Sequence, residues 1–155
     1  MDPLDFYEFA KEIRPNTSNF PEAMKRTIVG RVYYAIFLMV RDELGQSLQN
    51  SQFRSVYDSL SQQGPIHSLV VNVLKEVEAS NHLGNVLYGM GRRRRDADYK
   101  MHITKNWDRE INDTISDAEE ILRNRSAMQM LFSEKGPEID TLIVSWQSSY
   151  STRST

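Results

Sequence analysis

Residues 28–44 read IVGRVYYAIFLMVRDEL, and this stretch decides the fold. Its apolar residues fall on more than one side of a helix, which makes the stripe too wide for a helix that lies on a surface. Pro21 precedes it and suits the first turn of a helix, because its missing N–H costs nothing there. We therefore expect a central helix that begins near Pro21 and ends at Gly45, since glycine is favoured at helix ends.

Other parts of the chain show the apolar spacing of amphipathic helices. These are residues 6–13, 53–60, 66–77 and 107–122. A further helix is expected over residues 83–90 despite Gly84, Gly89 and Gly91, each of which costs about 1 kcal/mol relative to alanine. Thr104 or Asn106 would cap the helix over 107–122. No long stretch alternates at period two, so we expect an all-α fold, an up-and-down bundle of four main helices with additional short helices.

The chain is expected to divide near residue 128. Residues 1–128 would form the helical bundle, and residues 129–155 a C-terminal extension that is partly disordered. Within the extension, residues 139–146 are apolar and suit either a docking helix or a strand. The polar tail from Gln147 onward has the composition of a disordered segment.

The composition excludes several classes of protein. The 155 residues carry a net charge of -2 and contain no cysteine, which excludes disulfides, thiolate zinc sites and iron–sulfur clusters, and agrees with a cytoplasmic protein. The longest apolar stretch, Val32 to Val40, is far shorter than the roughly 20 residues that cross a bilayer. We expect no membrane association.

Several kinds of active site are absent from the sequence. His67, His82 and His102 do not pair at the i, i+3 or i+4 spacing of a helical metal site, and the chain has no Glu-x-x-His repeat. It also lacks a Walker loop and a G-x-G-x-x-G strand-to-helix turn. We therefore expect no metal and no cofactor.

The segment from Met90 to Lys105 is basic. It contains six Lys or Arg residues against two Asp, and the run Arg92–Arg95 stands seven positions before His102. A guanidinium binds two phosphate oxygens and an imidazole moves a proton near neutral pH, so the two together can cut RNA without a metal. In such a reaction the ribose 2′-hydroxyl is the nucleophile and His102 transfers protons. Arg95 or Arg94 would neutralise the phosphorane, while Arg92, Arg93 and Lys100 would bind the substrate.

Simpler roles for the same residues remain open. Four arginines are also typical of a solvated basic face that binds carboxylates of neighbouring helices, and a histidine after a helix can be a cap. Arg31 lies in an apolar run, where an unpaired charge is costly, so we expect it to pair with Asp98 or Asp96. The Tyr34 hydroxyl would satisfy a buried polar group, and Tyr99 would also be a structural supporting residue.

Two short motifs resemble a known family. Arg31–Phe37 reads RVYYAIF and Arg94–Tyr99 reads RRDADY, with a helix expected to begin near Thr104. This order resembles the HEPN domain superfamily, most closely its branch with YYA-x-F and R-x-x-A-D-Y signatures, over about residues 20 to 125.

The resemblance implies a four- or five-helix bundle, commonly a homodimer, in prokaryotic toxin–antitoxin, CRISPR-associated and other defence proteins. Many such proteins are metal-independent endoribonucleases with an Arg-x4–6-His motif, and Arg95, followed by Asp96 and separated from His102 by six residues, fits it. Arg94 matches the other signature by position but stands one residue too far from His102. Family members without the catalytic pair act as binding or partner subunits beside nucleotidyltransferases. The sequence thus predicts a ribonuclease or, as the alternative, a catalytically silent module that binds RNA, a nucleotide or a partner protein.

Overall fold

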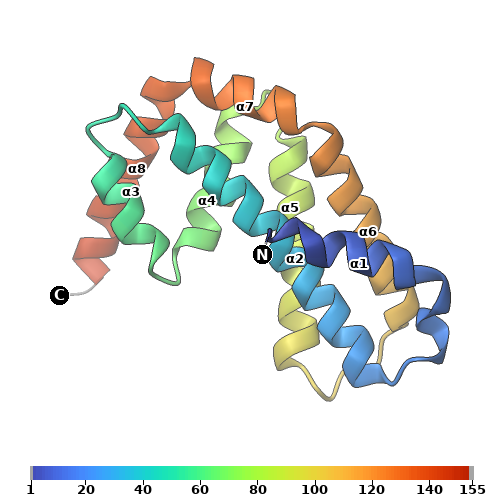
Figure 1. Cartoon of the computed structure of the whole chain (residues 1–155). Helices are drawn as coiled ribbons and strands as arrows, with labels where there is room; N and C mark the ends of the chain where they lie inside the picture. The colour runs from blue at the N-terminus through green and yellow to red at the C-terminus, as the bar shows by residue number, and fades with distance from the viewer. Residues whose placement is uncertain (1, 154–155) are drawn as a thin grey trace. The chain divides into compact units, whose positions relative to one another are not determined.

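The computed structural model describes residues 2–153, and this part of the chain is helical with no strand (Figure 1). The expected all-α class is confirmed. The elements in chain order are α1 (Leu4–Ile13), the 3-10 helix η1 (Arg14–Asn19), α2 (Glu22–Ser47), α3 (Arg54–Ser61), α4 (Ile66–Val77), α5 (His82–Tyr99), α6 (Trp107–Arg123), α7 (Arg125–Glu134) and α8 (Gly136–Arg153). No helix in the described range has the length and apolar character needed to cross a bilayer.

The helices form two compact units. The first consists of the chain up to Met39 together with Val86–Asn124, and the second of Val40–Asn85 together with the chain from Arg125 onward. Helices α2 and α5 each contribute one part to each unit. The units change at residues 39/40, 85/86 and 124/125. The predicted domain boundary at residue 128 stays a prediction.

The first unit is built from α1, η1, α6, the N-terminal part of α2 and the C-terminal part of α5. Helices α1 and η1 pack on α6. The core comes from the apolar faces expected from the sequence, and Val32, Ile36, Ile111 and Ile115 are completely buried. Asn106 caps α6, because its side-chain oxygen accepts a hydrogen bond from the Arg109 N–H at 3.1 Å.

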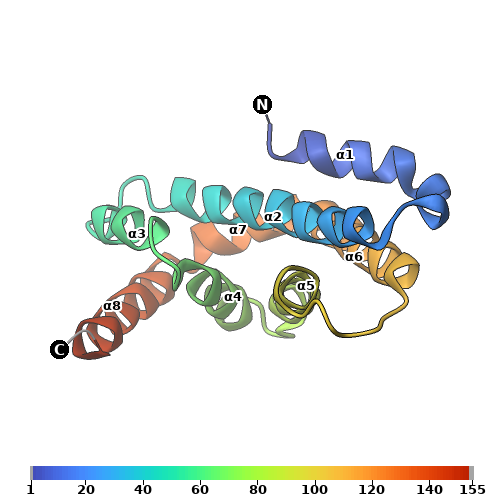
Figure 2. The ribbon, with the colours of Figure 1, turned by 90° about the horizontal axis from the view of Figure 1, so that it is seen from below.

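The second unit contains α3, α4, α7 and α8 with the remaining parts of α2 and α5. Helix α8 packs against α3, α4 and α7 (Figure 2). Ile139 and Ile143 anchor it, since both are completely buried. Of the two expectations for residues 139–146, the docking helix is therefore the one observed. Glu43 is a buried acid in this unit and accepts hydrogen bonds from Arg125 and Gln129 at 2.7 Å each.

Three helices end later than the sequence suggests. Helix α2 continues past Gly45 to Ser47, because Gly45 packs closely against the ring of Tyr57 and does not serve as a stop. Helix α5 runs to Tyr99, through its glycines and through the arginine run. Helix α8 extends to Arg153, where a disordered tail was expected, and residues 154–155 of that tail lie outside the described residues.

Close packing at two glycines explains why α5 forms despite its low helix propensity. A Cβ on Gly84 would lie 2.9 Å from the backbone nitrogen of Lys75, so the missing side chain allows α5 to approach α4. A Cβ on Gly91 would meet the ring of Tyr33 at 3.5 Å. Tertiary packing at these points outweighs the unfavourable propensity of glycine.

Candidate functional site

The four arginines at the end of α5 have different surroundings. Arg93 faces α6, where its Nε donates a hydrogen bond to Thr114 Oγ1 at 3.1 Å and its guanidinium pairs with Asp117. Burial raises the pKa of the Asp117 carboxyl, against the opposing charge of Arg93. Arg93 was expected to bind substrate, and here it fastens α5 to α6.

Arg94 is the centre of a network that joins α5 to α2. Its Nε lies 2.7 Å from Asp98 Oδ2, and its terminal nitrogen donates to the hydroxyls of Tyr34 and Tyr99. The guanidinium also lies over both rings, 4.9 Å from the centre of Tyr34 and 5.1 Å from that of Tyr99. The predicted supporting residues Tyr34, Asp98 and Tyr99 thus meet at Arg94. The two signature motifs contact one another here.

Arg92 and Arg95 are exposed. Within residues 2–153, no carboxylate lies within ion-pair distance of either guanidinium. The Arg95 guanidinium lies 5.8 Å from the centre of the Tyr88 ring, which leaves its N–H groups open to solvent on the other side. These two arginines therefore remain available to bind an anion.

Asp96 is held by two lysines. Lys100 Nζ lies 2.8 Å from Oδ1, and Lys105 Nζ lies 2.6 Å from Oδ2. The hydrogen bonds from Lys100 and Lys105 lower the pKa of the Asp96 carboxyl. Lys100, expected to bind substrate, is still more than half exposed, so it can serve both the carboxylate and a ligand.

Arg31 differs from its expected role. It is exposed and continues the exposed stripe of Ala23 and Thr27 along α2 at four-residue spacing, so its charge is not buried. Asp98 pairs with Arg94, and Asp96 pairs with Lys100 and Lys105, so the expected ion pair of Arg31 with one of these acids is not formed.

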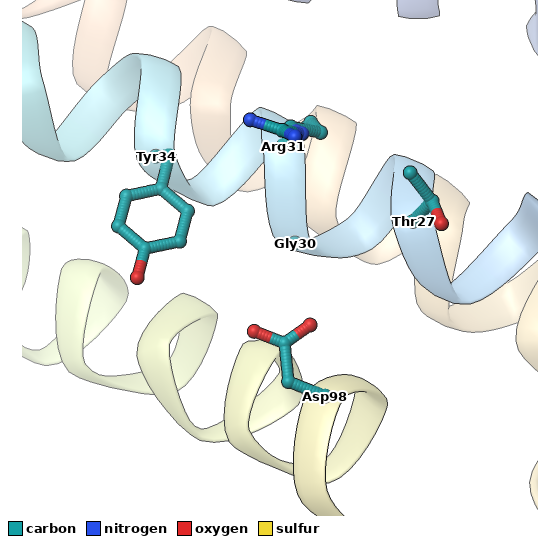
Figure 3. Close-up of a pocket in the computed structure, with 5 residues that line it drawn as sticks. All are labelled: Thr27, Gly30, Arg31, Tyr34 and Asp98. Atoms are coloured by element: carbon teal, nitrogen blue, oxygen red, sulfur yellow. The ribbon is translucent and has the colours of Figure 1, made fainter.

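A pocket of about 450 Å³ opens beside the Arg94 network. Its lining comes from α2 and α5 and consists of Thr27, Gly30, Arg31, Tyr34 and Asp98. Figure 3 shows the Asp98 carboxylate directed from α5 toward Gly30, and the Tyr34 hydroxyl directed from α2 toward α5. A Cβ on Gly30 would lie 3.2 Å from Asp98 Oδ1, so the glycine makes room for the carboxylate.

Arg26 holds the chain after α5 and was missed by the sequence analysis. It is 4% exposed, lies 4.3 Å from the centre of the Trp107 ring and pairs with Glu22 at 2.7 Å. Its guanidinium donates to five backbone carbonyl oxygens at 3.2–3.3 Å, those of Asp96, Ala97, Lys100, Met101 and Ile103. We call this arrangement the Arg26 clamp. The i, i+4 pair with Glu22 was visible in the sequence, but contacts with carbonyls 70 to 77 residues away were not.

His102 lies in the loop held by the clamp. The carbonyls on both sides of it, those of Met101 and Ile103, accept hydrogen bonds from Arg26, while the His102 side chain is exposed. In the described part of the chain, no hydrogen bond or ion pair joins His102 to Arg94 or Arg95. The backbone of the loop is thus fixed, and the imidazole is accessible from solvent.

Comparison with known proteins adds one relative. The chain is similar to an uncharacterized protein of Methanocaldococcus jannaschii, with 27% identity in an alignment of 158 positions that covers 84% of this chain and 95% of that protein. No family model matches the chain. No solved structure matches it either.

The arrangement suits an anionic ligand. Arg92, Arg95 and Lys100 supply exposed positive charge, and His102 supplies an exposed imidazole on a held loop. Among residues 2–153, no three His, Asp or Glu side chains gather as a metal-binding group would. Guanidinium groups bind phosphate oxygens in a bidentate manner, which makes a phosphodiester chain a suitable ligand.

Proposed function

We propose that this chain is a HEPN-like endoribonuclease that cleaves RNA by attack of the ribose 2′-hydroxyl, without a metal ion. The observation that carries the proposal is the Arg26 clamp, which holds the backbone on both sides of His102 and leaves the imidazole exposed. A general acid or base must be held in position to be effective. A buried arginine with five carbonyl acceptors supplies that rigidity.

The proposed reaction assigns a role to each exposed group. His102 takes the proton of the 2′-hydroxyl, whose oxygen attacks the adjacent phosphorus, and the bond from phosphorus to the 5′-oxygen breaks. The leaving 5′-oxygen takes up a proton from water, so the products are a 2′,3′-cyclic phosphate and a 5′-hydroxyl. Arg95 neutralises the charge on the phosphorane oxygens, and Arg92 and Lys100 hold neighbouring phosphates.

Arg94 enters this scheme as a positioning residue. Its ion pair with Asp98 and its contacts with Tyr34 and Tyr99 place α5 against α2, and so set the direction of the last turn of α5. Arg93 acts in the same way toward α6 through Asp117. Arg95 therefore fits the phosphate-binding role better than Arg94, in agreement with its spacing from His102.

The wider setting of the proposal comes from the family resemblance. It comprises an up-and-down bundle of four main helices, a homodimer that brings two Arg95–His102 pairs to one cleft, and a cytoplasmic role in prokaryotic defence. A toxin–antitoxin pair with a nucleotidyltransferase-type antitoxin is the form of that role we propose. Only the exposed side of the extension that begins at residue 129 would be available to a protein partner, because Ile139 and Ile143 are buried in the second unit.

A second candidate is a catalytically silent module that binds RNA, a nucleotide or a partner protein. One observation favours it: Arg94 is already ion-paired with Asp98, and within residues 2–153 no hydrogen bond or ion pair joins His102 to Arg94 or Arg95. A binding module needs only the exposed charge of Arg92, Arg95 and Lys100.

The test incubates the purified full chain with 5′-labelled RNA in EDTA. We expect products that end in 2′,3′-cyclic phosphate, and we expect His102→Ala and Arg95→Ala each to reduce cleavage by about 10²-fold or more. His82→Ala and Arg109→Ala are matched controls, because both residues are exposed and neither belongs to the site. RNA binding that weakens as salt rises, with no cleavage, would reject the ribonuclease and leave the binding module.

A further inference from the structure

One face of α5 carries two exposed arginines between two exposed tyrosines. Tyr88, Arg92, Arg95 and Tyr99 stand at positions i, i+4, i+7 and i+11, which fall on one side of a helix. We call them the tyrosine–arginine stripe. Tyr88 is 45% exposed and Tyr99 is 69% exposed, and both arginines are exposed as well.

The two rings are held in place by guanidinium groups. Arg95 lies over Tyr88 at 5.8 Å, and Arg94 lies over Tyr99 at 5.1 Å and donates to its hydroxyl at 3.3 Å. Each ring lies near a guanidinium, and the exposed fractions of Tyr88 and Tyr99 show that part of each side chain is accessible to a ligand. Aromatic rings presented in this way are the platforms on which unpaired bases stack.

The charge around the stripe favours a polyanion. Arg92 and Arg95 have no carboxylate within ion-pair distance in the described residues, whereas Asp98 is occupied by Arg94. The tyrosines lie eleven residues apart, about 16 Å along the helix axis at 1.5 Å per residue, which matches the length of a few nucleotides.

We propose that the tyrosine–arginine stripe is a binding track for single-stranded RNA, in which bases stack on Tyr88 and Tyr99 and phosphates bind Arg92 and Arg95. This inference rests on the proposed function, because it takes RNA as the ligand. It adds that the RNA is unpaired at the site, since bases inside a duplex cannot reach a tyrosine ring.

A second copy of this chain fits the stripe less well. Tyrosine and arginine are also common at protein interfaces. However, direct contact between the stripes of two copies would press Arg92 and Arg95 against the same residues of the partner, whereas the proposed homodimer leaves a cleft between the two Arg95–His102 pairs that RNA can occupy. Single-stranded RNA supplies both the phosphates and the bases.

The experiment measures RNA binding by fluorescence anisotropy with a labelled, unstructured 12-nucleotide RNA. The full chain carries His102→Ala in every sample, so that the RNA stays intact. Tyr88→Ala and Tyr99→Ala are each expected to weaken binding roughly 5- to 150-fold, the range for loss of one stacked base. Tyr88→Phe and Tyr99→Phe keep the ring and should bind within about threefold of the parent.

Two controls separate stacking from other effects. Phe9→Ala removes an exposed ring of α1 that is 52% exposed, and it should leave affinity unchanged. An oligonucleotide with the same backbone but without bases should bind the tyrosine variants and the parent equally, because only the phosphate contacts remain. Thermal unfolding of each variant checks that the Arg94 network is intact.

Each alternative result has a distinct meaning. If the alanine variants bind RNA as the parent does while Arg95→Ala weakens binding, the stripe is refuted and the proposed function stands. If the parent binds no RNA, both the stripe and the proposed function are refuted. If the alanine variants change the mass of the protein in solution and leave RNA affinity unchanged, the stripe contacts another copy of the chain and the proposal is overturned.

Discussion

The Arg26 clamp predicts a large and local effect of one substitution. Arg26→Met keeps most of the side-chain volume beside Trp107 and removes every donor of the guanidinium. Of the five carbonyls, those of Asp96 and Lys100 also accept backbone N–H groups, so three lose the donor observed in the structure. At about 1 kcal/mol for each unpaired carbonyl, we expect a loss of about 3 kcal/mol in the free energy of unfolding.

Urea denaturation followed by circular dichroism measures this loss. Arg26→Lys should recover only part of it, because an ammonium lacks the planar fork that reaches carbonyls on two sides. Arg109→Met is the control, since Arg109 is 78% exposed and lies 3.7 Å from its partner Asp113, and it should change stability by less than about 0.5 kcal/mol.

Amide hydrogen exchange locates the effect. Because two units need not unfold in one step, exchange at residues 100–106 tests the clamp more directly than the global transition does. These amides should exchange faster in Arg26→Met than in Arg109→Met. A stability within 1 kcal/mol of the parent, together with unchanged exchange in this loop, would refute the reasoning.

Two further predictions concern Asp96 and Gly84. Lys100 and Lys105 lower the folded-state pKa of Asp96, so this carboxylate stabilises the fold fully above the ordinary carboxyl pKa of 3.8 and loses that effect as pH falls through the lower folded value. In urea denaturation between pH 5 and pH 2, the free energy of unfolding should therefore fall less steeply for Asp96→Asn than for the parent. Parallel curves would contradict this prediction. Gly84→Ala should lower stability by about 1–3 kcal/mol, because the new Cβ would lie 2.9 Å from a backbone nitrogen, and an unchanged Tm would show that α4 and α5 separate without cost.

Much of the helical structure was predictable because the apolar spacing is regular. The prediction over residues 66–77 coincides with α4, and that over residues 6–13 lies within α1. The end of α5 was not predictable from propensity. Its glycines weaken the helix by themselves, and only the contacts of Gly84 with Lys75 and of Gly91 with Tyr33 show why the helix tolerates them.

The candidate site was predictable in composition but not in arrangement. Successive residues of a helix point about 100° apart, so a run of four arginines must face several directions. Tyr34 of α2 and Asp117 of α6 determine which arginines are bound within the chain, and neither residue is close to the arginines in sequence. The assignment of Arg26 needed the path of the chain after α5, which no local pattern contains.

The order of the two units along the chain affects how the protein can be made. The first unit needs both the segment that ends at Met39 and the segment Val86–Asn124, and most of the second is synthesised in between. A nascent chain that has emerged only as far as α4 cannot yet complete either unit, so folding during translation must wait for α6 and then for α8. Until then the apolar residues among 28–39 stay uncovered, which leaves the half-synthesised chain prone to aggregation.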